Sequence, residues 1–562
     1  MLQIRFPDFL YAIGAKQNVK CPAQSRAQCG ANGISLRGRL NGPFGGHPKK
    51  RSGRQVSGSV FDQSPGGDSR SVMPAWGDRG AKGLAMRQLT GLDAAFLAID
   101  SPTVYGHVGS MLLLDPPLRG GPLTLQRLTE LVESRLHLAP PFRWRLVEVP
   151  FGLDQPYWIE DPHFDIEFHV RELALPAPGD SHQLATQAAR LHARPLDRRR
   201  PLWEMYLIHG LEGGRQAMYT KVHHAAIDGV SGNDLLVALL DTSPEPGEAA
   251  TVDRWRPDAE PGGLQLLARS ALSATLRPIR LVRLSAELMR SLPALATSPT
   301  RPRLPVIDRL LSRRGGDVVL SAPPLVAPHT PFNKTVGPHR RWAFGSLALE
   351  EVKEIKNAGA VTVNDVVLAL SAGALRTWLR EHDALPTGPL LAAVPVSIRT
   401  EQEKTTQGNR VSSVIVPLPT HVSDPGERLR AVHEAMRVAK KQFDAMPADL
   451  LTDIAQFSMP ALANQASRLA HRLRLLERIP PFNLFISNVP GPTVDLYLCG
   501  ARLDAVYPLS AIADGQGLNI TVLGSRGKLN FGILADRELV PDVEAVMDAL
   551  VDELALLRKA VS

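Results

Sequence analysis

The residues best suited to chemistry are two adjacent histidines, His223 and His224, which are followed by Asp228 and Gly229. Histidine is the side chain whose pKa lies nearest neutral pH, so it can take a proton from a hydroxyl group and return it. A carboxylate such as Asp228 can orient the turn through an ion pair, and Gly229 permits backbone conformations that other residues resist. The pattern His-His-x-x-x-Asp-Gly is therefore a candidate site for acid–base chemistry.

Two other interpretations of the histidine pair stay open, because paired histidines also bind metals or pack as satisfied core residues. A zinc site is disfavoured, since the spacing is not His-Glu-x-x-His and no obvious third ligand stands nearby. The three cysteines, Cys21, Cys29 and Cys499, are too few and too scattered for a zinc site or a disulfide framework. Such sparse cysteines are typical of a protein in a reducing cytoplasm.

The elements around the motif predict that it lies at the end of a strand. Residues 203–208 and 217–222 are expected to form two strands, joined as a hairpin by a Gly-Gly turn at 211–215. A helix is expected from 231 to 240, directly after the motif. A motif on a turn after a strand presents its side chains into a cleft.

From Met86 onwards the hydrophobic pattern is that of an α/β protein. It predicts an N-terminal half at 86–250 and a C-terminal half at 340–562, joined by a linker and an Arg-rich amphipathic crossover at 251–339. Further helices are expected at 124–137, 181–193, 364–379 and 543–557, and further strands at 108–114, 164–170, 390–396, 412–418, 484–487, 518–523 and 528–534.

The formal net charge of +8 comes from an extension rather than from this α/β body. Residues 1–85 hold 13 Lys and Arg against 4 Asp and Glu, whereas the remaining 51 basic and 52 acidic residues nearly cancel. Because 1–85 also lacks a sustained apolar period, we expect a disordered basic extension, or an artefact of an upstream start site. A nucleic-acid partner is not expected, and no apolar run approaches the roughly 18 residues of a transmembrane helix.

Several further motifs follow one another along the body. Leu-Thr-Gly-Leu-Asp-Ala-Ala-Phe-Leu opens it at 89–97, and Pro201-Leu202-Trp203-Glu204 precedes the histidines. Later motifs are Asn364-Asp365-Val366, Pro395-Val396-Ser397-Ile398-Arg399, Gly408-Asn409-Arg410, Ile486-Ser487-Asn488-Val489-Pro490-Gly491-Pro492 and the segment 532–537. Together with the histidine motif, this set resembles the bacterial wax ester synthase/diacylglycerol acyltransferase family. That family belongs to a superfamily with chloramphenicol acetyltransferase and the condensation domains of nonribosomal peptide synthetases.

The resemblance implies two chloramphenicol-acetyltransferase-like halves with a cleft between them. His224 would be the general base and His223 would support it. Asp228 would be structural, holding the loop against an arginine, for which Arg399 is the candidate and Arg410 a competitor. The other motif residues would bind substrate or shape the site: Pro201, Leu202, Trp203, Asn364, Asp365, Gly408, Asn409, Ser487, Asn488, Pro490 and Gly491.

These motif residues also have purely structural explanations. The segment 201–203 could be ordinary core, since tryptophan is usually a packing residue. Asn364 and Asp365 could form no more than a helix N-cap. The segment 487–491 could be an ordinary turn after a strand.

The reaction that the resemblance implies is direct acyl transfer. His224 would remove the proton from an acceptor hydroxyl, whose oxygen attacks the thioester of a long-chain acyl-CoA and expels the CoA thiolate. The acceptor would be diacylglycerol, giving triacylglycerol, or a fatty alcohol, giving a wax ester. No cofactor or metal is expected, because acyl-CoA is a substrate.

The block 264–314 bears on where such an enzyme would work. It contains ten Arg and no Lys, with Glu287 and Asp308 as its only acids, and Leu and Ile are interleaved among them. A basic amphipathic stretch of this kind can lie on an anionic membrane or lipid-droplet surface, although a solvated crossover helix has the same composition. We therefore expect a cytoplasmic protein bound peripherally to the inner face of the plasma membrane or to lipid droplets.

Two other functions remain as alternatives. One is a condensation-type or polyketide-associated acyltransferase, although no adenylation or carrier module is recognisable in the chain. The other is a non-catalytic protein that binds lipid surfaces, against which the complete His-His-x-x-x-Asp-Gly motif argues.

Overall fold

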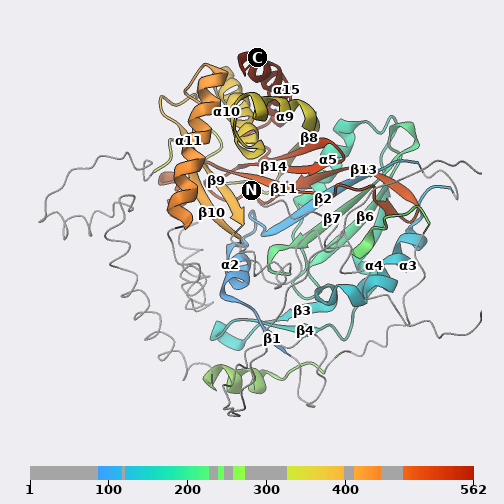
Figure 1. Ribbon diagram of the computed structural model, residues 1–562. Helices are drawn as coiled ribbons and strands as arrows, with labels where there is room; N and C mark the ends of the chain where they lie inside the picture. The colour runs from blue at the N-terminus through green and yellow to red at the C-terminus, as the bar shows by residue number, and fades with distance from the viewer. Residues whose placement is uncertain are drawn as a thin grey trace, which may run out of the picture. The chain divides into compact units, whose positions relative to one another are not determined.

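The computed structural model describes residues 86–116, 121–226, 238–245, 257, 259–272, 326–397, 411–444 and 473–561. Figure 1 shows these residues as two mixed sheets with helices around them, together with a small third sheet. The α/β class expected from the sequence is present in both halves of the chain.

The first sheet has six strands in the order β12-β13-β2-β7-β6-β5. Its members are β2 (His107–Leu114), β5 (Val170–Ala174), β6 (Trp203–His209), β7 (Gln216–His223), β12 (Tyr497–Leu498) and β13 (Ala501–Leu509). Every residue of β7 is buried because both faces of the sheet are covered. Met218 and Val222 pack into one apolar cluster, and Ala217 and Tyr219 into another on the opposite face.

Two strands of this sheet come from the C-terminal part of the chain. β13 pairs antiparallel with β2, and β2 pairs with β7 on its other side. The predicted division into 86–250 and 340–562 therefore does not follow the sheets, because residues 497–509 belong to the sheet that bears the histidine motif. Strand pairing at such a distance along the chain leaves no local signal in the sequence.

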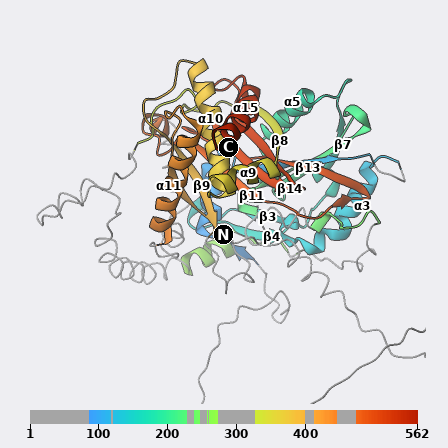
Figure 2. The same cartoon turned by 45° about the horizontal axis from the view of Figure 1, so that its top comes forward.

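The second sheet has the order β10-β9-β11-β14-β15-β8. Its strands are β8 (Arg340–Ala348), β9 (Leu390–Ser397), β10 (Val411–Leu418), β11 (Leu484–Pro490), β14 (Leu518–Ser525) and β15 (Lys528–Asp536). Four helices pack on it and on one another, α9 (Leu349–Ala358), α10 (Val363–Glu381), α11 (Pro425–Asp444) and α15 (Val543–Val561), as Figures 1 and 2 show. The short helix α14 (Leu475–Arg478) precedes β11.

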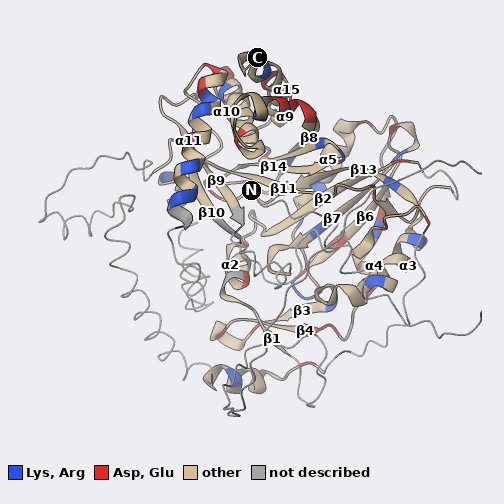
Figure 3. Cartoon of the chain, viewed as in Figure 1, with Lys and Arg blue, Asp and Glu red and all other residues tan. Residues whose placement is uncertain are grey.

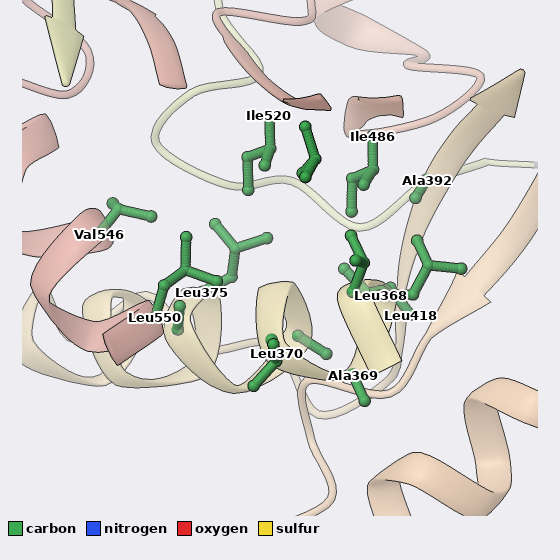
Figure 4. Close-up of a cluster of buried hydrophobic side chains, with 14 of the residues drawn as sticks. Leu368, Ala369, Leu370, Leu375, Ala392, Leu418, Ile486, Ile520, Val546 and Leu550 are labelled. Carbon is green, nitrogen blue, oxygen red and sulfur yellow. The ribbon is translucent and has the colours of Figure 1, made fainter. Parts of the chain in front are cut away.

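The core of this half lies between α10, α15 and the sheet. Figure 4 shows Leu368 and Leu375 of α10 beside Ile486 and Ile520 of the strands and Val546 of α15. Their complete burial explains why α10 reads as an apolar stretch in the sequence. No single helix in the described ranges meets the length and hydropathy expected of a membrane span, and only α9 with α10, bent by 102° between them, does so as a pair.

One buried ion pair joins two of these helices. Arg428 on α11 donates a hydrogen bond from Nη2 to Oε1 of Glu553 on α15, and both side chains are buried. Gly373 on α10 makes room for the pair, because a Cβ atom there would lie 2.1 Å from Cδ of Glu553. A buried charge needs a partner, so α10, α11 and α15 depend on one another.

A small sheet, β1-β4-β3, and several helices complete the first half. The strands are β1 (Arg87–Gln88), β3 (Trp144–Val147) and β4 (Tyr157–Glu160), and the helices are α2 (Gly91–Ile99), α3 (Leu125–Arg135), α4 (Ile166–His169) and α5 (Ser181–His192). Side chains cap three of these helices as the sequence suggests, with Thr90 at α2, Thr124 at α3 and Asp180 at α5.

One predicted strand is wrong. Residues 164–170 alternate between apolar and polar side chains, but 166–169 form the helical turn α4 and the strand begins only at Val170. The side chain of Asp165 accepts a hydrogen bond from the N–H of Glu167, which caps the turn. His169 is then buried, with its ring stacked on Trp203 at 4.4 Å. Local capping and this tertiary contact outweigh the twofold alternation.

Candidate active site

The histidine pair lies at the junction where β7 ends and the short 3-10 helix η5 (His224–Ala226) begins. The backbone N–H of His223 donates to the carbonyl of Leu202 at 3.0 Å, and that of His224 donates to the carbonyl of Gly106 at 2.8 Å. The residues immediately before β6 and β2, the two strands that flank β7, therefore position both histidines through main-chain hydrogen bonds. This is the strand-end position that the sequence predicts.

His223 is held by hydrogen bonds at both ring nitrogens. Nδ1 accepts a hydrogen bond from the N–H of Ala225 at 3.1 Å, so the ring proton lies on Nε2. Nε2 is 3.2 Å from Oδ2 of Asp100 and donates to this carboxylate. The side chain of His223 is almost fully buried, so its role is fixed by these two contacts.

Asp100 is the centre of a small network at the end of α2. Its carboxylate accepts a hydrogen bond from the N–H of Gly106 at 2.6 Å and another from Nη2 of Arg198 at 2.9 Å. Burial alone would raise the pKa of Asp100, but the hydrogen bonds from His223, Gly106 and Arg198 lower it. Asp100 thus stays ionised and orients the His223 ring.

His224 has a different environment. Its ring stacks on Phe96 of α2 with centroids 4.6 Å apart and planes 13° from parallel. Nδ1 is buried and has no hydrogen-bond partner among the residues that the structure describes. Burial lowers the pKa of His224 to about 4, with a smaller contribution from His223. The imidazole is therefore neutral at pH 7, which is the form that can accept a proton.

Gly106 allows the close approach on which this arrangement depends. A Cβ atom at this position would lie 3.0 Å from Nε2 of His223 and 3.0 Å from the carbonyl oxygen of Phe96. Any larger residue would push the loop 100–106 away from the histidines. The loop 100–106 therefore packs closely against the ends of α2 and β7.

A buried polar network lies on the same face of the sheet. Lys221, two residues before His223 on β7, forms an ion pair with Glu204 at 3.1 Å and donates to two backbone carbonyls. His107 lies directly opposite His223 in the register of β2 and β7, and its Nε2 is 2.7 Å from the carbonyl oxygen of His192. Burial lowers the pKa of His192 to about 3. These contacts satisfy the polar groups behind the strand that bears the histidines.

Comparisons with known proteins identify the family. A model of the wax ester synthase/diacylglycerol acyltransferase catalytic domain matches residues 89–367, and a model of the C-terminal domain of the same family matches 407–558. A probable diacylglycerol O-acyltransferase of Mycobacterium tuberculosis is 38% identical over 477 residues, which cover 84% of this chain and 98% of that protein. The chain belongs to the wax ester synthase/diacylglycerol acyltransferase family.

Other relatives agree with this assignment. A putative diacylglycerol O-acyltransferase of Mycobacterium tuberculosis is 39% identical over 472 residues, covering 84% of this chain and 99% of its own length. Among solved structures, the wax ester synthase/diacylglycerol acyltransferase from Marinobacter aquaeolei VT8 is 29% identical with a TM-score of 0.59, over 84% of this chain and all (100%) of that one. A trichothecene 15-O-acetyltransferase from Fusarium sporotrichioides, at 13% identity and a TM-score of 0.51, shares the fold. The predicted family, fold class and O-acyltransferase class are confirmed.

The family motif at 201–203 supports the histidines through its backbone. Leu202 contributes the carbonyl that holds His223, and the Leu202 side chain is buried. Trp203 is buried in the core, where its Nε1 donates to the carbonyl of Phe142 at 2.8 Å. The carbonyl of Pro201 accepts from the N–H of Trp203, which closes the turn into β6. The packing explanation of this motif agrees with the structure.

The motif at Asn364 and Asp365 lies in the first turn of α10. Thr362 is the N-cap, and Asp365 completes a capping box by accepting from the N–H of Thr362 at 2.9 Å. Oδ2 of Asp365 is also 2.8 Å from Nδ1 of His433 on α11. Asp365 therefore joins two helices, and Asn364 is half-buried beside it. The capping explanation therefore agrees with the structure for Asp365, although the N-cap residue itself is Thr362 rather than Asn364 or Asp365.

The motif at 487–491 comprises the last residues of β11 and the residue that follows it. Ser487 and Asn488 pair in parallel with Thr521 and Val522 of β14. A Cβ atom at Gly491 would lie 2.4 Å from the carbonyl oxygen of Gly524, so glycine is needed for close approach of the two strands. Pro490 ends β11. Across the described ranges, no hydrogen bond joins Asn364, Ser487 or Asn488 to the histidine pair.

The remaining predicted residues, Asp228, Gly229, Arg399, Gly408, Asn409 and the competitor Arg410, lie outside the described residues. Most of the Arg-rich block and the helix expected at 231–240 also lie there. The partner of Asp228 and the roles assigned to these residues stay predictions.

Sequence reasoning missed Asp100, Arg198, Gly106 and Phe96. Asp100 stands 123 positions before His223, and no periodicity or spacing links them. A weak signal existed, because the motif at 89–97 already contains Phe96, and Asp100-Ser101-Pro102 is a typical turn sequence.

A small pocket with both polar and apolar lining residues, Arg87 and Asp93 among the polar ones, lies beside the histidine motif. Ala225 and Ala226 line it together with Trp144 and Trp158 of the small sheet and Leu89. Across the residues that the structure describes, no group of three His, Cys, Asp or Glu side chains is arranged to hold a metal ion.

Proposed function

We propose that this protein transfers a long-chain acyl group from acyl-CoA to the hydroxyl of diacylglycerol, and to fatty alcohols, with His224 as the general base. The observation that carries the proposal is the environment of His224. It is a neutral imidazole at a strand end, held by its own main chain and by Phe96, and one buried ring nitrogen has no hydrogen-bond partner among the described residues. The names of the relatives, diacylglycerol O-acyltransferases and a wax ester synthase, support the choice of acceptors.

The reaction proceeds by direct transfer. His224 takes the proton of the acceptor hydroxyl while the oxygen attacks the thioester carbonyl, which gives a tetrahedral oxyanion. The oxyanion collapses, the carbon–sulfur bond breaks, and the thiolate of CoA receives the proton that the imidazolium holds. No enzyme-bound acyl group forms. Among the described residues the free cysteine, Cys499, is buried against Arg127, and burial raises the pKa of its thiol.

His223 supports this reaction by position. Its ring proton is directed at Asp100, so it cannot serve as an unpaired base in the way that His224 can. Asp100 and His223 instead fix the end of β7 from which His224 projects. Arg198 and Gly106 hold Asp100 in turn.

We also propose that the enzyme meets its lipid substrates at an anionic membrane or lipid-droplet surface, to which it binds peripherally from the cytoplasm. The block 264–314 begins with helical residues that pack through Leu266 on Val149 and Tyr157 of the small-sheet region. Leu264 is 85% exposed there, and Phe151 of the adjoining loop is 81% exposed. Exposed large apolar side chains next to a segment with ten Arg suit a lipid surface.

The test of the proposed activity is an assay of purified protein with labelled palmitoyl-CoA and a panel of acceptors. Diacylglycerol and hexadecanol should yield triacylglycerol and wax ester, whereas small polar alcohols and amines should yield little product. Product from amines but not from alcohols would contradict the proposal and favour a condensation-type reaction.

A further inference from the structure

A second cavity lies between α5 of the first half and β8 of the second. Its volume is about 220 Å³, and it is distinct from the pocket beside Ala225 and Ala226. In Figure 3 basic positions are marked on both α5 and β8. The lining residues are Ala185, Thr186, Ala189 and Arg190 from α5, Arg340, Arg341 and Trp342 from β8, Arg537, and Glu544 from the first turn of α15.

Four arginines and one carboxylate line the cavity, so its lining carries an excess of positive charge, which the nearby carboxylates of Asp536 and Asp514 offset in part at Arg340. The lining carboxylate, Glu544, lies 3.5 Å from Nδ1 of His182. In the part of the chain that the structure describes, no carboxylate lies within ion-pair distance of Arg190, Arg341 or Arg537. Nε of Arg341 is also buried and has no hydrogen-bond partner among the described residues. A buried, unpaired guanidinium nitrogen costs free energy unless a ligand satisfies it.

The shape and chemistry of the cavity select a small anion. Its volume is below the roughly 300–1,000 Å³ of pockets that enclose a whole drug-sized ligand. Guanidinium groups present forked donors that match phosphate oxygens in pairs. The position of Arg190 in the last turn of α5 also stabilises that helix, but this does not explain Arg341 or Arg537, which lie on other elements.

The cavity is connected to the loop that holds the histidines. Arg340 is buried and donates from Nη2 to the carbonyl of Thr103 and from Nη1 to the carbonyl of Gly337. Thr103 lies between Asp100 and Gly106, the two residues that contact each other beside His223. A ligand in the cavity therefore sits next to an arginine that touches the catalytic loop.

We propose that this cavity binds a phosphate group of the nucleotide end of acyl-CoA. The inference rests on the proposed function, since of the two proposed substrates only the thioester carries phosphates, whereas diacylglycerol and fatty alcohols carry none. A phospholipid headgroup offers the same phosphate chemistry, and the experiment separates the two sources. The arginines bind and place the donor substrate, while His224 performs the proton transfer.

The experiment compares wild-type protein with the double variant Arg341→Gln/Arg537→Gln, leaving the buried Arg340 in place. The control is Arg380→Gln/Arg430→Gln, which removes the same charge from exposed positions of α10 and α11 that do not line the cavity. Calorimetric titrations use CoA and pantetheine, and sedimentation uses phosphatidylglycerol vesicles. Melting temperatures of the variants establish that each is folded.

We expect the cavity variant to bind CoA about tenfold or more weakly than wild type, as loss of hydrogen bonds to a charged group implies. Its KM for palmitoyl-CoA should rise with little change in kcat, and the difference from wild type should disappear with a palmitoyl thioester of pantetheine. The control variant should behave as wild type.

Equal affinity of wild type and cavity variant for CoA would overturn the proposal. So would loss of vesicle binding with CoA affinity intact, because the phosphate recognised would then be a lipid headgroup. Failure of the proposed acyltransferase reaction is a separate result, since CoA titration detects the cavity without turnover. Arginine-dependent CoA binding in a protein with no turnover would support the cavity and reject the proposed function.

Discussion

Two histidines that are neighbours in the sequence have opposite chemical situations. His223 uses both ring nitrogens in hydrogen bonds, to Ala225 and to Asp100. His224 stacks on Phe96, and its Nδ1 has no hydrogen-bond partner in the part of the chain that the structure describes. The difference arises because successive side chains at a strand end point in different directions, so one faces the loop 100–106 and the other does not. This asymmetry is the basis for assigning the base to His224.

Removal of His224 should abolish most turnover. We expect His224→Ala to lower kcat by about 10²–10⁴-fold with the fold intact, because general-base catalysis contributes an amount of that order. His223→Ala should lower it less, because His223 acts through position. Both are measured with palmitoyl-CoA and diacylglycerol, with circular dichroism as the check on folding. A His224→Ala variant with near-native activity would exclude the mechanism.

The pH dependence of the rate should reflect the low pKa of His224. The neutral imidazole is the active form, and burial lowers its pKa to about 4, so the base stays deprotonated throughout the neutral range. We expect kcat/KM to be flat near neutrality and to fall only as the pH drops below about 5. An acid limb with an apparent pKa at or above 6.5 would show that His224 is not desolvated in the free enzyme.

Asp100 should matter to catalysis as a positioning residue. Asp100→Asn removes the charge that His223 and Arg198 contact, and loss of a hydrogen bond to a charged group implies about a ten- to hundredfold lower kcat. The control is Asp115→Asn, the same change in an exposed ion pair with Arg502, which should have little effect. If the loss of activity is accompanied by a large drop in melting temperature, the role of Asp100 is purely structural. Unchanged activity would contradict a positioning role.

At the scale of elements, the second half depends on a tight contact among three helices. Gly373 of α10 faces the buried pair of Arg428 and Glu553, which come from α11 and α15. No sequence pattern links the glycine to the two charged residues, because they lie on three different helices. The contact between Gly373 and the ion pair forms only when the three helices pack together.

Gly373→Ala should therefore destabilise the protein. The added Cβ would lie 2.1 Å from Cδ of Glu553, so the ion pair must shift, and overpacking typically costs about 1–3 kcal/mol. The control is Gly388→Ala, because a Cβ atom there meets nothing within 4 Å. Urea unfolding should show a lower free energy of unfolding for Gly373→Ala than for wild type. The free energy of unfolding of Gly388→Ala should be almost unchanged. Equal stability of the two would contradict the packing described.

At the scale of the molecule, the two halves are not independent domains. β13 comes from the C-terminal half, and it completes the sheet that carries the histidines by pairing with β2. β13 also packs against β14 and β15 of the second sheet. The histidine pair on β7 thus depends on residues nearly three hundred positions later, although the histidine motif itself is short.

Binding to a lipid surface should be electrostatic and salt-sensitive. The block 264–314 carries ten Arg and two acids, and each basic residue near an anionic leaflet contributes about 1 kcal/mol. We expect sedimentation with anionic vesicles and release at high salt, because the Debye length falls to about 3 Å at 1 M. Gln at four or more of Arg277, Arg280, Arg283, Arg290, Arg313 and Arg314 should weaken binding. The control Arg380→Gln/Arg430→Gln should not. Equal, salt-insensitive binding to neutral and anionic vesicles would reject this surface.

The sequence by itself determined the family, the α/β class, most of the strands and helices, and the place of His224 at a strand end. These features are local: apolar periods, caps such as Thr90 and Thr124, and contiguous motifs each act over a few residues. Local rules failed at 164–170, where a cap and the ring of Trp203 converted an alternating stretch into a helical turn.

Only the tertiary structure decided which side chains meet. It brought Asp100 to His223, Phe96 to His224 and Arg340 to Thr103, across separations that carry no sequence period. It also showed that Asp365 and Trp203 act largely through packing and capping. The physical reason is that hydrogen bonds and burial depend on distance in space, which strand pairing and helix packing set only after distant segments come together.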